Sequence, residues 1–137
     1  MEKKLIWGGL AAGVTFFILG FLFYGLIMMN FFKEQATAGI YKEMPEFPLL
    51  IVGNIVMGFF YAIILGSWAK VSSAGEGAKK GFIMALVFGI GYDLIMYSTS
   101  NIMTMEGMLG DIAVTTIMGV IVGAVVGMVM GSSNKTA

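Results

Sequence analysis

The sequence predicts an all-α integral membrane protein, a four-helix bundle made of two similar helical hairpins. Three observations indicate this fold class: four long apolar stretches, a composition of 58% hydrophobic against 12% charged residues, and a mean hydropathy of +0.92. A water-soluble core of 137 residues cannot enclose so much apolar surface. Helices are expected as the spanning elements because backbone groups in lipid must be hydrogen-bonded internally. We expect a single domain over residues 1–137.

Four stretches are long enough to cross a bilayer, which takes about 20 apolar helical residues. We expect the spans at about residues 5–32, 47–69, 81–97 and 112–130. The first stretch is far longer than the apolar core of about 7–15 residues in a secretory signal, which favours a retained span. The polar residues Ser98–Asn101 are expected to end the third span.

The lysines predict the orientation of these spans. Lys33 and Lys42 fall on one side, and the other lysines of the chain fall on the opposite side, with both termini and the 70–80 loop. The positive-inside rule places the lysine-rich side in the cytoplasm. We therefore expect both ends of the chain to be cytoplasmic.

The two hairpins share short sequence patterns. Tyr24–Met28 resembles Tyr92–Met96, and Gly53–Ile55 resembles Gly110–Ile112. A duplication would relate the hairpins by an axis along the membrane normal. The alternative is chance similarity between apolar segments, which use a small set of residue types.

The composition excludes several function classes. The chain has no Cys and no His, and its eight basic residues are all lysines. Disulfides, thiolate nucleophiles and the usual zinc or haem sites are therefore not expected. The net charge of zero argues against nucleic acid as a partner. No nucleophile lies near a general base in sequence, so we expect no enzyme activity, no cofactor and no metal site.

Small residues recur at every fourth position in three of the spans. Such rows let helix backbones approach closely in lipid. The favoured interpretation is packing among the protein's own helices; the alternative is an interface with itself or with other membrane helices. The predicted packing residues are Gly58, Ala62 and Gly66 in the second span and Gly119, Gly123, Gly127 and Gly131 in the fourth, with Gly77, Gly81, Ala85 and Gly89 in a row in the third.

Asp93 is the most informative single residue, since it lies inside the third span. A carboxylate in hydrocarbon must pair, hold a proton or face water. We expect a polar cluster of Asp93, Asn54, Asp111 and Thr115, which acts either as a proton or cation site or as a packing hydrogen bond. Asn54 and Asp111 each follow a glycine, a pattern typical of residues that cap the start of a helix.

Several motifs together resemble a family of small four-span bacterial integral membrane proteins of unknown function. They are Gly53-Asn54, Gly66–Ala69, Gly91–Tyr97, Ser100–Met103 and Asp111-Ile112. The resemblance extends over most of the chain and implies a multi-pass protein of the bacterial inner membrane. It implies no activity and no site residues.

Two function classes follow from these observations. The expected one is a non-catalytic accessory or structural subunit that packs its small residues against other membrane helices. The alternative is a small proton- or cation-conducting carrier or channel that uses Asp93. Binding of a lipid or hydrophobic ligand between the hairpins is a third possibility. The expected partners are membrane lipids and either other membrane helices or further copies of the chain.

Overall fold

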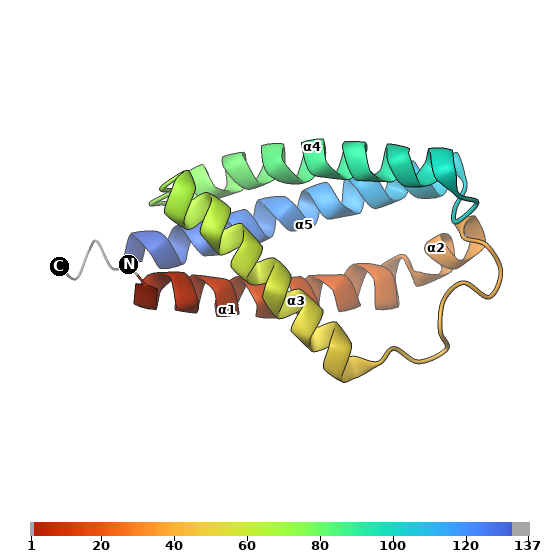
Figure 1. Ribbon diagram of the computed structural model, residues 1–137, viewed down its shortest axis with the longest axis horizontal. Coiled ribbons are helices and arrows are strands. Elements are labelled where there is room, and N and C mark those ends of the chain that lie inside the picture. The colour runs from red at the N-terminus through yellow and green to blue at the C-terminus, as the bar shows by residue number, and fades with distance from the viewer. Residues whose placement is uncertain (1, 133–137) are drawn as a thin grey trace.

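The computed structural model describes residues 2–132, and most of these residues are helical (Figure 1). Within that range there is no β-strand, and one isolated antiparallel bridge joins Ala36 to Met103. The elements in chain order are α1 (Glu2–Gly20), the π-helix η1 (Phe21–Ile27), α2 (Met29–Gln35), α3 (Phe47–Tyr61), the π-helix η2 (Ala62–Trp68), α4 (Ala74–Thr99) and α5 (Met105–Ser132).

Four helical segments are long and apolar enough to cross a membrane, which indicates a multi-pass membrane protein. They are Lys3–Ile27, Phe47–Trp68, Ala74–Thr99 and Met105–Ser132. The number of spans agrees with the sequence prediction, whereas three of the four differ clearly from the predicted boundaries.

Each difference in boundary has a local cause. The first span ends at Ile27 rather than Phe32, because the π-helix closes with the N–H of Met28 bonded to the carbonyl of Phe23 and α2 begins separately. The third span begins at Ala74, within the expected 70–80 loop, because the Ser73 hydroxyl accepts the N–H of Glu76 and so caps α4. The hydroxyl of Thr104 accepts the N–H of Gly107 and likewise starts α5 early.

The helices lie side by side and form two ends of the molecule (Figure 1). The start of α1, the segment 69–73 and the end of α5 lie at one end, called here the terminal end. The connections 36–46 and 100–104 lie at the opposite, loop end. Helix α4 runs along α5, α1 contacts both α3 and α5, and α3 crosses α1 obliquely so that its first turns diverge from the other helices.

Glycines form the contact between α4 and α5. A Cβ atom added at Gly77 would overlap the carbonyl oxygen of Gly123, and one added at Gly81 would overlap that of Gly119. Added Cβ atoms at Gly127 and Gly131 would overlap the backbone just before α4. The small-residue row of the fourth span therefore faces its neighbour α4 within the same chain.

A second glycine contact joins α1 to α3. A Cβ atom at Gly58 would overlap the backbone of Gly9 and Gly13, and one at Gly13 would lie 2.8 Å from the Cα of Ile55. Gly9 and Gly13 were absent from the predicted rows. Gly66 contacts the side chain of Met130 rather than another backbone.

The two hairpins are built differently. Both π-helices lie in the first hairpin, whereas α4 and α5 are continuous α-helices. The sequence comparison pairs Tyr24 with Tyr92, yet Tyr24 is half-buried and Tyr92 is 53% exposed. In the second hairpin the next residue, Asp93, points inward instead.

Candidate functional site

Asp93 lies in the interior of the protein, and its side chain lacks a full set of partners. Only 5% of the residue is exposed. Its Oδ2 atom is fully buried and has no hydrogen-bond partner among residues 2–132. An unsatisfied carboxyl oxygen in the interior is costly, which makes Asp93 the main candidate functional residue of the structure.

A second carboxyl group, that of Asp111, is close enough to Asp93 to interact with it directly. Asp111 also accepts a 2.6 Å hydrogen bond at Oδ1 from the Tyr24 hydroxyl. Helix α4 supplies one acid, α5 supplies the other, and η1 supplies the tyrosine. Three elements distant in sequence thus meet at one polar group.

The two acids line a common cavity of about 230 Å³, called here the carboxylate cavity. All four spans contribute to its wall, which is mostly apolar and aromatic. None of the described residues in the wall is a lysine, so no side-chain cation balances the two acids. The lining residues are Phe16, Met57, Tyr61, Ala85, Phe88, Gly89, Tyr92, Asp93, Asp111, Thr115 and Met118.

Threonine hydroxyls contribute little free hydrogen-bonding capacity to this cavity. Thr115 lies in its wall, and its hydroxyl donates to the carbonyl of Asp111 in the preceding turn at 2.9 Å. Thr116 is buried and donates to the carbonyl of Ile112 at 2.7 Å. Both donors are used within α5, so neither satisfies Asp93.

The structure corrects the predicted role of Asn54. This residue lies within α3 and does not cap it, because the helix already begins at Phe47. Its amide donates to the carbonyl of Leu50 at 2.8 Å, and it lines a different cavity from Asp93. The predicted cluster is therefore only partly assembled: Asp93, Asp111 and Thr115 meet, whereas Asn54 is separate.

Asp111 likewise lies inside α5 rather than at its start. Gly53 and Gly110 precede the two predicted caps but do not interrupt their helices. A helix within an apolar layer keeps its internal hydrogen bonds even at glycine, since no water replaces them. The Asp111 carboxylate therefore does not cap α5 and instead interacts with Tyr24 and Asp93 on other helices.

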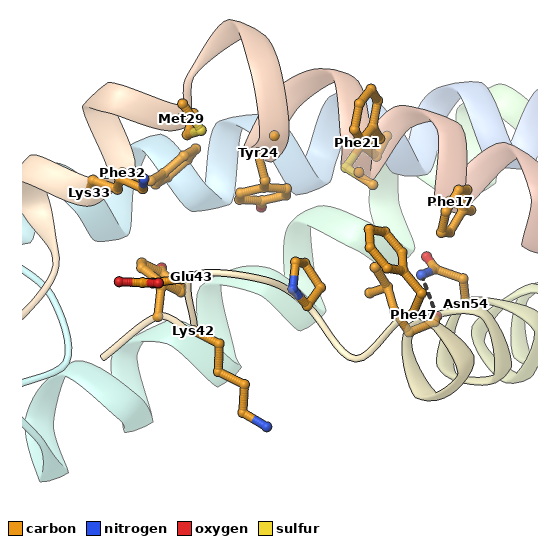
Figure 2. A pocket seen from close by; sticks show the side chains of 16 residues that line it. Phe17, Phe21, Tyr24, Met29, Phe32, Lys33, Lys42, Glu43, Phe47 and Asn54 are labelled. Atoms are coloured by element: carbon orange, nitrogen blue, oxygen red, sulfur yellow. Dashed lines mark hydrogen bonds between the residues drawn. The ribbon is translucent and has the colours of Figure 1, made fainter. Parts of the chain in front are cut away.

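A second cavity, of about 520 Å³, lies between η1, α2 and the start of α3, and is called here the loop-side cavity. Figure 2 shows charged side chains at one end of this cavity and a group of aromatic rings at the other. The lining residues are Phe17, Gly20, Phe21, Tyr24, Gly25, Met29, Phe32, Lys33, Tyr41, Lys42, Glu43, Pro45, Phe47, Leu50, Asn54 and Met118.

Tyr24 and Met118 separate the two cavities. Tyr24 lines the loop-side cavity while its hydroxyl bonds to Asp111, which lines the carboxylate cavity. Met118 lines both cavities and is only 7% exposed. Tyr24 belongs to a π-helical segment, a distortion that occurs frequently at functional sites.

Tyr41 lies at the margin of the loop-side cavity, outside the spans. Partial burial, together with the negative charge of Asp111, raises the pKa of Tyr41 above its ordinary value of 10.0. The phenol is therefore neutral at physiological pH.

Sequence reasoning missed Tyr24 and Met118 as site residues. Tyr24 was considered only as part of a repeat, although a phenol inside a span needs a hydrogen-bond partner, and this requirement was the available signal. Nothing in the sequence distinguishes Met118 from the other methionines. The described residues contain no group of three or more acidic, histidine or cysteine side chains suited to a metal ion.

The arrangement is suited to holding one positive charge. Two carboxyl groups in an apolar cavity without a balancing lysine repel one another unless a proton or a small cation lies between them. Tyr24 fixes one oxygen of Asp111 and leaves the unpartnered oxygen of Asp93 to receive that charge.

No protein-family model, curated protein or solved structure matches this chain. The resemblance to small four-span bacterial proteins thus stays a prediction.

Proposed function

We propose that the protein is a small carrier or channel that moves protons or small monovalent cations across a membrane, with Asp93 and Asp111 as the binding site. The observation that carries this proposal is the buried, unpartnered Oδ2 of Asp93 beside a second carboxyl group. Acidic residues inside membrane spans are expensive to bury and commonly mark ion or proton pathways.

The proposal also places the site in a membrane with a defined orientation. The four helices form one bundle in the bacterial inner membrane, with the lysine-rich terminal end in the cytoplasm. The loop-side cavity then faces the outer side, and ions reach the acids from there past Tyr24 and Met118. The π-helix η1, which contains Tyr24, supports such a path, because π-helical segments occur frequently at functional sites.

The accessory-subunit hypothesis stays a prediction, and one of its arguments is weaker. The hypothesis requires the protein to pack its small residues against other membrane helices. Gly119, Gly123, Gly127 and Gly131 all contact α4 or the segment before it. The native mass of the complex after gentle extraction tests that hypothesis, since co-purifying chains would support it.

Flux measurements in liposomes test the transport proposal. Purified protein is reconstituted in vesicles with an imposed pH gradient or a gradient of Na⁺ or K⁺. Wild-type protein is expected to dissipate at least one gradient, and Asp93→Asn is expected to abolish that flux. Glu106→Gln is the matched control, because it makes the same chemical change in the exposed first turn of α5.

Each outcome bears on the proposal directly. Flux that is lost in Asp93→Asn and kept in Glu106→Gln supports a site at Asp93. Equal flux in the wild type and Asp93→Asn would overturn it, and so would no flux of H⁺, Na⁺ or K⁺ from wild-type vesicles. Circular dichroism of each variant establishes that the helices are retained.

A further inference from the structure

The loop-side cavity is not explained by an ion site. Its volume of about 520 Å³ lies within the range of about 300–1,000 Å³ typical of small-molecule sites, and is far more than a proton or a monovalent cation needs. Phe17, Phe21 and Phe47 are grouped at one end of the cavity in Figure 2, beside Asn54, whose amide already donates to the carbonyl of Leu50. Such a wall fits a hydrocarbon chain.

Two opposite charges at the other end of this cavity have no partner. Lys33 and Glu43 both line it, and neither makes a hydrogen bond or an ion pair within residues 2–132. Lys42 differs, since its amine pairs with Glu46 and extends away from the aromatic group in Figure 2. This end of the cavity is therefore lined by one cation and one anion that lack a partner among the described residues.

The aromatic and the charged residues of the cavity fall on different sides of the ends of the spanning segments. Phe17, Phe21 and Phe47 belong to spanning segments, whereas Lys33 and Glu43 lie outside them. Helix α3 diverges from the other helices at its start (Figure 1), and Phe47, Leu50 and Asn54 from this part of the helix line the cavity. A molecule in the bilayer would have its apolar and polar parts at the same depths as those of the cavity.

We propose that the loop-side cavity binds one phospholipid with an ethanolamine headgroup. One acyl chain occupies the aromatic part, the phosphate lies at Lys33 and the ammonium donates to the carboxylate of Glu43. Charge complementarity selects this lipid: an anionic headgroup such as glycerol phosphate leaves Glu43 unmatched, and a choline headgroup has no N–H to donate. The lipid is held by Lys33 and Glu43 rather than by the acid pair, but it occupies the cavity through which ions are proposed to reach that pair, so a bound lipid would obstruct the ion route.

Native mass spectrometry of the full chain in mild detergent tests the proposal. Dioleoyl lipids with ethanolamine, glycerol or choline headgroups are added singly and in pairs at equal concentration. We expect wild-type protein to retain the ethanolamine lipid about two- to fivefold better than either of the others, the size of effect that an exposed ion pair supplies. Glu43→Gln is expected to remove this preference, and Lys33→Gln to weaken binding of both phospholipids in a mixed pair.

Phe21→Ala tests the acyl-chain part, with Phe82→Ala as its matched control. Both rings are half exposed, at 53% and 44%, but only Phe21 lines the cavity. Loss of lipid adducts in Phe21→Ala alone supports the site. Equal retention of the three lipids by the wild type, or equal adducts in the two phenylalanine variants, would overturn it and indicate only non-specific binding of lipid around the protein.

Discussion

The hydroxyl of Tyr24 donates a 2.6 Å hydrogen bond to Oδ1 of Asp111 and so links the π-helical end of the first span to the fourth span. The bond connects the linings of the two cavities, because Tyr24 lines one and Asp111 lines the other. It also fixes one oxygen of the acid pair beside Asp93. This contact therefore joins a residue of the proposed ion site to a residue that lines its proposed route of access.

Removing the hydroxyl at Tyr24 is expected to destabilise the protein. Tyr24→Phe leaves a carboxylate oxygen of half-buried Asp111 without its donor, and hydrogen bonds to charged groups contribute about 1.5–3 kcal/mol. Thermal unfolding in detergent measures the effect. Tyr92→Phe is the control, since Tyr92 is 53% exposed and stacks on Phe88. Equal melting temperatures for the two variants would show that the Tyr24 bond contributes nothing.

The glycine contact between α4 and α5 gives a prediction within one helix. Gly81→Ala inserts a methyl group against the backbone of Gly119, whereas Gly91→Ala meets nothing within 4 Å. Overpacking costs about 1–3 kcal/mol, so Gly81→Ala is expected to lower the melting temperature. Gly91→Ala is expected to be neutral or slightly stabilising, because alanine favours helix. A similar loss in both variants would contradict close packing at Gly81.

Met118 is expected to control the connection between the cavities. Met118→Ala removes the side chain that lines both, at a cost of about 2–5 kcal/mol in stability. The same change is expected to raise ion flux in liposomes, because the carboxylate cavity then opens toward the loop end. Met128→Ala on the same helix is the control, since Met128 is 59% exposed. Unchanged flux in Met118→Ala would argue against access by this route.

Periodicity was sufficient to predict the helical class, the number of spans and the rows of small residues, because each is a property of one helix at a time. The rows did not predict which neighbouring helix each of them contacts. Gly123 contacts α4, and Gly58 contacts Gly9 and Gly13 on α1. Which helices meet depends on the shape of all four spans together, and spacing along one of them carries no such information.

Capping signals were misread for a related reason. A glycine followed by Asn54 or Asp111 is typical of a helix start in water, but both residues lie inside helices that remain continuous through the glycine. The π-helix around Tyr24 was also not predictable, since nothing in Phe21–Ile27 distinguishes it from regular apolar helix. The site therefore combines Asp93 and Asp111, which were in the predicted cluster, with Tyr24, which was not.

The central claim is that the Asp93–Asp111 pair holds an exchangeable proton or cation, and labelling with a hydrophobic carbodiimide tests it most directly. This reagent adds to protonated carboxyl groups that it reaches through an apolar phase, and mass spectrometry of peptides locates the adduct. In buffer without small metal cations, we predict an adduct on Asp93 or Asp111 that disappears in the Asp93→Asn variant, and that Na⁺ suppresses if the site also binds that ion. No adduct on either acid under those conditions would contradict the account.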